Sequence, residues 1–371
     1  MRYTRMPIEA ESPEQMGYDK IRNNLSESSY TDAFLREFSG GEDLGRLLLC
    51  YGSHEGHEGL RELIVSGSGA LTRDQVLLTI GAAGALFIIA TTLLEKGDEL
   101  IVVRPNYATN IETPRAIGAT IHFIDLHFEN RWALDIDAIK RAITPGTRYI
   151  SVTHPHNPTG ACLEEPQLLQ LAAIAETHNL YVLVDETYRD MVFDRQLPLA
   201  VEYSPRIISI SSLSKTYGLP GLRTGWLICR DRPLFETFLA AKEQIHICGP
   251  VIDEELAYRY LLHRDRHFPR ITADIRAKLE IVKNWMGQQD DWEWVEPRGG
   301  CVGFPRLKDP GAVDIDRFYH SLLADYGTYV GPGHWFEMPR HYMRLGFGWP
   351  TKEQLKEGLS ALTAAVRASR C

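Results

Sequence analysis

Between residues 72 and 228 the chain alternates short runs of Val, Ile and Leu with longer stretches of helical character. A strand that is apolar on both faces must be covered on both faces, and helices between such strands supply the crossovers of a parallel sheet. We therefore expect an α/β fold with a mainly parallel sheet covered by helices. The expected strands span residues 75–80, 99–103, 120–124, 148–152, 180–184, 206–210 and 225–228. The expected helices span residues 82–94, 107–117 and 165–178.

The pattern changes near residue 250. A long, charged helical stretch runs to about residue 289, and shorter segments of both strand and helix character follow it. Such a mixture predicts a smaller α+β domain. Its expected strands span residues 292–295, 300–304 and 342–346, and its expected helices span residues 313–324 and 352–368.

Composition narrows the classes of function. The 371 residues carry a formal net charge of −9 and no run of five basic residues, so we expect neither nucleic acid nor an anionic membrane as a partner. The longest apolar stretch, residues 82–94, is too short to span a bilayer, and the first ten residues contain no apolar signal core. The six cysteines are scattered without metal-ligand spacing. We therefore expect no metal site, reduced thiols and a cytoplasmic protein.

A single lysine, Lys215, stands among hydroxyls and glycines in the stretch that spans residues 211–223. Lysine amines form Schiff bases with carbonyl cofactors, pyridoxal phosphate (PLP) above all. The phosphate of such a cofactor needs hydroxyl donors and a guanidinium, which Ser212, Ser214 and Arg223 provide. The stretch therefore indicates a lysine that acts beside a bound phosphate.

This stretch resembles the lysine signature of class I/II aminotransferases, a large family of PLP enzymes of fold type I. The resemblance extends from Tyr51 to the C-terminus. It implies the fold-type I architecture of PLP-dependent transferases, with a large PLP-binding domain over residues 46–248 and a smaller α+β domain over residues 249–371. The N-terminal segment, residues 1–45, would pack with the smaller domain, which is thus built from both chain ends.

Two further residues follow the expected strand at residues 180–184, in the family's Asp-x-x-Tyr pattern. The carboxylate of Asp185 can hydrogen-bond a pyridine nitrogen and favour its protonated form, which is the electron sink that PLP chemistry needs. The resemblance implies that Tyr188 donates to the phenolic oxygen of PLP. Asp185 standing alone could equally cap a helix.

Other cofactor contacts are implied by the resemblance at positions that also end strands. Asn157, in an Asn-Pro-Thr-Gly turn, would contact the phenolic oxygen and the substrate, and Tyr107 would stack on the pyridine ring. The turn formed by Gly81, Ala82 and Ala83 would let backbone N–H groups approach the phosphate at a helix N-terminus.

The resemblance also implies contacts to the substrate and to a second subunit. Arg344 would bind the substrate α-carboxylate as a bidentate pair. Tyr51 would cross a two-fold interface to the neighbouring phosphate, which implies a homodimer. His54 and His57 follow Tyr51, and they could line the mouth of the site or lie in a solvated loop.

The function implied is transfer of an amino group between an L-amino acid and a 2-oxo acid, with Lys215 holding PLP as a Schiff base and moving the Cα proton. An alternative keeps PLP and ends in elimination, replacement or cyclisation at Cβ or Cγ, as in C–S lyases and capreomycidine synthase. A regulatory module would need a basic DNA-binding segment, and an inactive scaffold would lack the catalytic residues. No second arginine suits a side-chain carboxylate, which argues against dicarboxylic donors, and the substrate is otherwise unspecified.

Overall fold

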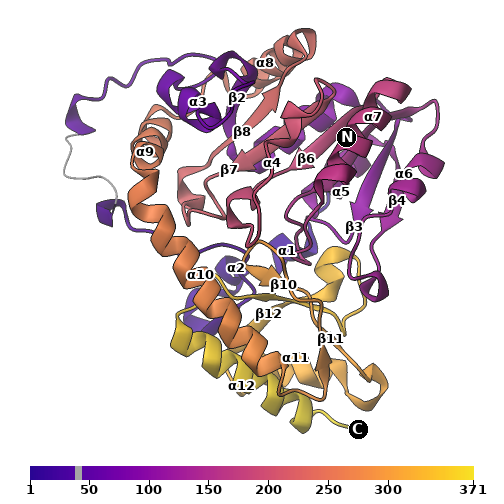
Figure 1. The fold of residues 1–371 in the computed structure, drawn as a ribbon. Helices are drawn as coiled ribbons and strands as arrows, with labels where there is room; N and C mark the ends of the chain where they lie inside the picture. Colours follow the sequence, from indigo (N-terminus) through magenta and orange to yellow (C-terminus); the bar gives the residue numbers. More distant parts are fainter. Residues whose placement is uncertain (38–43) are drawn as a thin grey trace.

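The computed structural model describes residues 1–37 and 44–371, so residues 38–43 of the expected N-terminal segment lie outside the described residues. A seven-stranded sheet forms its larger part, with the strand order β2-β8-β7-β6-β5-β3-β4 (Figure 1). The strands are β2 (Val76–Ile80), β3 (Glu99–Arg104), β4 (Thr120–Asp125), β5 (Thr147–Thr153), β6 (Tyr181–Asp185), β7 (Ile207–Ser212) and β8 (Thr224–Cys229). All seven expected strands are present. Strands β3 to β7 run parallel, whereas β8 is antiparallel to both β2 and β7.

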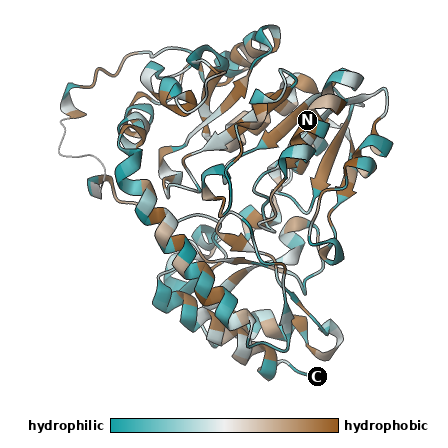
Figure 2. Ribbon diagram, in the orientation of Figure 1, coloured by the Kyte–Doolittle hydropathy of each residue, from teal (hydrophilic) through white to brown (hydrophobic). Residues whose placement is uncertain are grey.

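Successive strand residues point to opposite sides of this sheet, and helices cover both sides, so both faces are buried. In β3, Leu100 and Val102 pack under α4 (Gly81–Leu93), α5 (Thr109–Ile117) and α8 (Arg232–His246). Ile101 and Val103 pack on the other side, under α6 (Ile136–Ala142) and α7 (Glu165–His178). Full burial of each such side chain stabilises the fold by roughly 1.5–3 kcal/mol. Figure 2 shows the resulting apolar strands between helices of mixed polarity.

A smaller sheet forms the second part of the molecule, in the order β1-β12-β13-β10. Its strands are β1 (Asn23–Leu25), β10 (Val302–Gly303), β12 (Thr328–Pro332) and β13 (Met343–Gly346), and a separate pair joins β9 (Trp292–Glu293) to β11 (Arg306–Leu307). Helices α10 (Arg264–Met286), α11 (Ile315–Ala324) and α12 (Lys352–Ala368) cover it. Strand β1 pairs with β12 in parallel, so the N-terminal segment supplies an edge strand, and Leu25 enters the core of this part.

The expected helical stretch of residues 250–289 is two helices, because its apolar residues serve two different cores. Helix α9 (Val251–Leu262) buries Leu256 and Tyr260 with α3 (Glu58–Val65) and the β2–β8 edge of the large sheet. Helix α10 instead buries Ile275 and Leu279 in the core of the smaller part. The break at His263 turns the chain from one core to the other. The boundary at residue 249 remains a prediction, and α9, which follows it, packs on the large sheet.

Two short helices, α1 (Pro7–Ala10) and α2 (Pro13–Met16), lie between the two sheets (Figure 1). Within the described ranges, no helix combines the length and apolar character needed to cross a membrane.

Candidate active site

A pocket opens at the carboxyl ends of the parallel strands, where ligands bind in open α/β sheets. It lies against residues from three separate parts of the chain: the large sheet, the smaller sheet and the N-terminal segment. The residues predicted from sequence that line it are Ala82, Ala83, Tyr107, Asn157, Asp185, Tyr188, Ser212, Ser214, Lys215, Arg223 and Arg344. Gly81 lies directly behind this lining, and Tyr51 lies away from it.

Lys215 follows β7 in a turn whose position is fixed by the N-terminal segment. The amide of Tyr30 donates a 2.9 Å hydrogen bond to the carbonyl oxygen of Lys215. The lysine side chain is half-buried and lines the pocket. Among the described residues no hydrogen bond or ion pair engages its Nζ atom, so the amine remains available for a ligand.

Asp185 ends β6 and is buried at the base of the pocket. Its Oδ1 accepts hydrogen bonds from the backbone N of Thr187 at 3.0 Å and from Thr187 Oγ1 at 2.6 Å. Burial raises the pKa of Asp185, and these two bonds together with the charge of Lys215 oppose that rise. A cationic ring nitrogen next to the second oxygen would stabilise the ionised form.

An anion cradle forms where β2, β8 and α4 meet. Gly81 has φ of +66°, and its amide donates a 2.7 Å hydrogen bond to the carbonyl oxygen of Arg223. A Cβ atom at Gly81 would lie 2.5 Å from Arg223 Nη2, so only glycine lets this guanidinium approach the turn. Helix α4 begins here without a side-chain cap, which leaves amides of its first turn for an anion. Ser212 and Ser214 add hydroxyls to the lining of the pocket.

Arg344, on β13, is buried with a relative exposure of 5%. It donates from Nη2 to the carbonyl oxygen of Ser26 at 2.8 Å and from Nη1 to Asn157 Oδ1 at 3.3 Å. Phe336 and Trp335 pack around the guanidinium, whose carbon lies 5.2 Å and 5.8 Å from their ring centroids. Its Nε has no partner among the described residues, and burial lowers its pKa. A bound carboxylate would satisfy this buried cation.

Two tyrosines line the pocket with hydroxyls that are bonded to the N-terminal segment. Tyr188 donates a 2.6 Å hydrogen bond to the carbonyl oxygen of Ser28, and Tyr107 donates a 3.3 Å bond to Glu9 Oε1. Burial raises the pKa of Tyr107 to about 12, so this hydroxyl keeps its proton. The contacts of Tyr188, Tyr107 and Asn157 with PLP therefore remain predictions.

The two histidines near Tyr51 contact helices and do not line the pocket. His54 Nδ1 lies 2.6 Å from Glu243 Oε1 on α8. His57 caps α3 by accepting the amide of Leu60 at 3.0 Å. Tyr51 is 78% exposed, as a residue that reaches another molecule must be.

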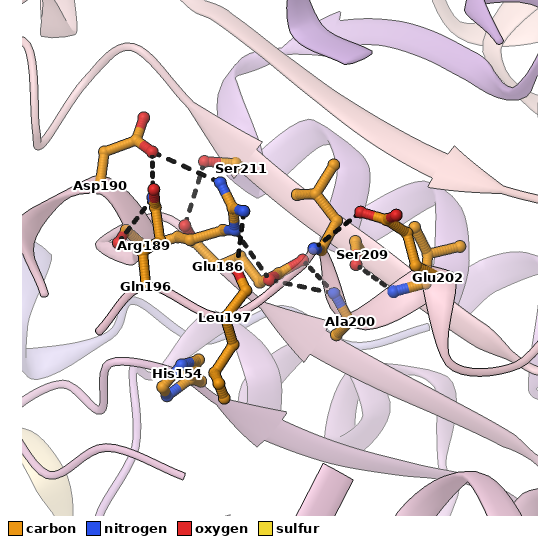
Figure 3. A network of polar contacts seen from close by, with 12 residues as sticks. His154, Glu186, Arg189, Asp190, Gln196, Leu197, Ala200, Glu202, Ser209 and Ser211 are labelled. Carbon is orange, nitrogen blue, oxygen red and sulfur yellow. Dashed lines mark hydrogen bonds and ion pairs between the residues drawn. The ribbon is translucent and has the colours of Figure 1, made fainter. Parts of the chain in front are cut away.

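Behind the pocket, a buried polar network supports the ends of β6 and β7 (Figure 3). Glu186 accepts hydrogen bonds from the amide of Ala200 at 3.2 and 3.3 Å and lies 3.7 Å from Arg189 Nε. Ser211 Oγ donates to the carbonyl oxygen of Glu186 at 3.3 Å, which links the residue after Asp185 to the residue before Ser212. Burial raises the pKa of Glu186 to about 7.

Sequence reasoning did not assign several residues that line the pocket. Thr187 orients Asp185, and its place two residues beyond that carboxylate is the Asx-turn signal that could have identified it. Glu9, Glu14 and Glu27 also line the pocket, and no local pattern distinguishes them from surface glutamates.

The described residues fit one kind of cofactor. An available lysine suits its carbonyl, a buried carboxylate suits its ring nitrogen, and an uncapped helix with an arginine and two serines suits its phosphate. The fold and this site together define a PLP-dependent enzyme of fold type I.

Comparison with known proteins identifies the family. The model of the aminotransferase class I and II family matches residues 24–362. Arginine–pyruvate transaminase of Pseudomonas aeruginosa is 31% identical over 309 residues, 80% of this chain and 77% of that protein. Capreomycidine synthase of Streptomyces vinaceus is 29% identical over 356 residues, 93% of this chain and 90% of that protein. The chain therefore belongs to the class I and II aminotransferase family.

A solved structure supports the same assignment. A PLP-dependent aminotransferase from Streptococcus suis superposes with a TM-score of 0.91 at 27% identity, covering 100% of this chain and 99% of that one. The expected fold type, the PLP cofactor and the aminotransferase function are thereby confirmed.

Proposed function

We propose that Lys215 is the Schiff-base lysine and proton carrier of this aminotransferase, and that Arg344 holds the α-carboxylate of its amino acid substrates. The observation that carries this proposal is the convergence of Lys215, Asp185 and Arg344 on one pocket from β7, β6 and β13. These three groups are a nucleophilic amine, a carboxylate and a guanidinium. Together they match the carbonyl, the ring nitrogen and the substrate carboxylate that transamination must hold.

Each residue then has a definite task. When bound, PLP supplies an electron sink for the charge that develops at the substrate Cα. Asp185 keeps the ring nitrogen protonated, and Arg344 orients the substrate so that its Cα–H faces Lys215. The amine of Lys215 takes the Cα proton from the amino acid and, in the second half-reaction, returns a proton to the Cα of the incoming 2-oxo acid. Ser212, Ser214 and the first-turn amides of α4 bind the phosphate together with Arg223.

A second candidate function uses the same residues and ends in elimination or cyclisation at Cβ or Cγ. The match to capreomycidine synthase, which spans 93% of this chain, favours it specifically. The residues that set up proton removal at Cα are shared by both outcomes. The substrate side chain and the amino acceptor therefore distinguish the two functions.

An absorbance experiment tests both candidates. The purified holoenzyme is mixed with single L-amino acids, and the visible band of the lysine-bound cofactor is followed. We expect a suitable donor to replace this band with the near-ultraviolet band of the aminated cofactor, and 2-oxoglutarate to restore it. Consumption of the donor while the visible band returns without any acceptor would instead identify a lyase or cyclase. The lysine assignment fails if Lys215→Ala retains the visible band.

We further propose that the protein is a homodimer and that Tyr51 reaches the neighbouring site. Support comes from large apolar side chains that are exposed near Tyr51 on the single chain: Leu48 (74%), Leu49 (70%), Ile245 (51%), Ile247 (43%) and Ile252 (46%). Gly52 lies against Val251, and His54 contacts Glu243, so these segments are neighbours.

Six unpaired thiols also support a cytoplasmic location.

Hybrid dimers test the role of Tyr51. Lys215→Ala and Tyr51→Ala are each expected to be poorly active, and their mixture after subunit exchange is expected to regain activity. In such a hybrid one site combines an intact Lys215 with an intact Tyr51 from the other subunit. A mixture no more active than its components would contradict a shared site.

A further inference from the structure

The pocket holds more negative charge than the cofactor and the α-carboxylate require. Its cationic residues within the described ranges are Lys215, Arg223 and Arg344. In the proposed function these three are committed to the cofactor carbonyl, the phosphate and the substrate carboxylate. Asp185 is likewise committed to the ring nitrogen. Three further carboxylates, those of Glu9, Glu14 and Glu27, remain in the lining without a cationic partner.

Glu27 is the most firmly placed of the three. It follows β1, and both of its neighbours are bonded to site residues: Ser26 accepts from Arg344 at 2.8 Å, and Ser28 accepts from Tyr188 at 2.6 Å. On its far side, a Cβ atom at Gly346 would lie 1.8 Å from the Glu27 carbonyl oxygen, so the backbones are in direct contact. The backbone of Glu27 is therefore held in register with the carboxylate-binding arginine.

The Glu27 side chain is half-buried and makes no hydrogen bond or ion pair with any described residue. Burial raises its pKa, while the positive charges of Lys215 and Arg344 lower it, so both cations lie within electrostatic range. A half-buried carboxylate without a direct partner is unfavourable. A cation bound in the pocket would remove this cost.

Glu9 and Glu14 extend the same negative surface toward solvent. Glu9, on α1, accepts the Tyr107 hydroxyl, and Glu14, on α2, is exposed. Burial, together with the charges of Glu27, Glu14 and Asp32, raises the pKa of Tyr18 to about 12. Glu14 and Glu27 thus lie within electrostatic range of the same tyrosine, and α1 and α2 lie between the sheets (Figure 1).

We propose that Glu27, assisted by Glu9 and Glu14, selects an amino acid substrate whose side chain ends in a cation, either a guanidinium or an ammonium group. This inference rests on the proposed function, because Arg344 and Lys215 fix which end of the substrate faces Glu27. A donor with a second carboxylate would instead bring like charges together in a partly dehydrated pocket. Glu27 is a specificity-determining residue for the side chain and takes no part in proton transfer.

A panel of donors with the holoenzyme tests the inference, with conversion of the cofactor band as the readout. L-Arginine and L-ornithine represent the two cations, L-citrulline is the neutral analogue of arginine, and L-glutamate is the dicarboxylic donor. We expect a cationic donor to exceed L-citrulline and L-glutamate in kcat/KM, mainly through KM. The ratio of arginine to ornithine shows which cation the site prefers. If L-citrulline is used as well as the better of the two cationic donors, or if L-glutamate is preferred, the inference is overturned.

The variant Glu27→Gln tests whether Glu27 causes the preference for cationic donors. Glu27→Gln is expected to lower kcat/KM for the preferred cationic donor by about 10- to 100-fold, since a charge-assisted hydrogen bond is lost. L-Citrulline should change far less. Glu62→Gln removes the same charge from an exposed position on α3 and should leave both donors unchanged. Equal losses for both donors in Glu27→Gln would overturn the assignment.

Binding without turnover separates this inference from the proposed function. An α-methyl amino acid lacks the Cα proton, so its binding does not depend on proton transfer. We expect α-methyl-L-ornithine to bind more tightly than α-methyl-L-norleucine, and the difference to shrink in Glu27→Gln. Equal binding overturns the inference even if transamination is observed. Selective binding supports it even if no donor is converted, in which case the proposed function alone fails.

Discussion

Arg344 Nη1 donates a 3.3 Å hydrogen bond to Asn157 Oδ1, which joins the smaller sheet to the strand end of the larger one across the pocket. The two residues are 187 positions apart in the sequence. A substrate carboxylate bound by Arg344 would therefore lie beside Asn157, between the two parts of the molecule. This relationship places the proposed substrate-binding arginine on one part of the fold and the proposed catalytic lysine on the other.

Replacing Arg344 should weaken substrate use more than it weakens the fold. Arg344→Gln removes a buried cation, and we expect a loss of about 3–5 kcal/mol of substrate interaction, or roughly 10²- to 10⁴-fold in kcat/KM. Arg344→Lys keeps the charge but loses the planar fork, so its loss should be intermediate. Steady-state kinetics and thermal melting of both variants provide the measurement. A kcat/KM of Arg344→Gln equal to that of the native protein would remove Arg344 from the site.

We expect Asp185 to contribute to kcat through its negative charge and not through the shape of its side chain. Asn in its place can still accept both bonds from Thr187, but it cannot stabilise a protonated ring nitrogen. We expect kcat of Asp185→Asn to fall by about 10²-fold or more, as removal of a charged catalytic partner does. Thr187→Val removes one charge-assisted hydrogen bond but keeps the charge of Asp185 and its bond from the Thr187 amide, so kcat should fall by about 10-fold at most. Similar effects for the two variants would argue against a charge role for Asp185.

The sequence predicts the large sheet well because the relevant signal is local. Runs such as residues 99–103 are apolar on both faces and lie between helical stretches, and this pattern has few other solutions. The antiparallel direction of β8 was not predictable, since a buried strand has the same composition in either direction. The break at His263 was missed for a related reason: both α9 and α10 are helical locally, and only the two separate cores show where the chain must turn.

The residues of the candidate site likewise differ in how well the sequence predicts them. Lys215 stands in a distinctive local stretch, and the family resemblance that this stretch carries implies the role of Asp185 and the cofactor, so these could be predicted. Glu27 stands in no such pattern, and an isolated glutamate is normally exposed. Its place in the pocket depends on the bond between Ser26 and Arg344, which joins residues 318 positions apart. Contacts over such separations come from the fold and not from local sequence.

The buried network behind the pocket should make stability depend on pH. Burial raises the pKa of Glu186 to about 7, from an ordinary value of 4.5. Between these values the folded protein binds a proton that the unfolded chain releases, so the contribution of Glu186 to the free energy of unfolding falls as pH rises, by at most about 1.4 kcal/mol per pH unit. Glu186→Gln lacks this titration. Urea unfolding at pH 5, 6 and 7 should therefore show the native protein losing stability relative to the variant as pH rises. A difference that stays constant or increases would contradict this assignment.

A tight backbone contact lies under the anion cradle, where β8 passes the turn at Gly81. Gly225, on β8, pairs with Thr79 on one side and Ser212 on the other. A Cβ atom at Gly225 would lie 2.4 Å from the carbonyl carbon of Gly81 and 2.6 Å from the amide nitrogen of Ala82. Both neighbours are backbone atoms, so they can yield only if the turn that begins α4 moves.

Gly225→Ala should therefore cost about 1–3 kcal/mol of stability through overpacking, and it should also weaken PLP binding because the displaced turn carries the amides proposed to bind the phosphate. Gly67→Ala is the matched control, because nothing lies within 4 Å of its added methyl group, and its stability should stay within about 0.5 kcal/mol of the native value. Titration of the apo-protein with PLP and chemical unfolding measure the two effects. If stability falls while PLP affinity is unchanged, the turn at Gly81 tolerates the shift and the first-turn amides of α4 contribute little to phosphate binding.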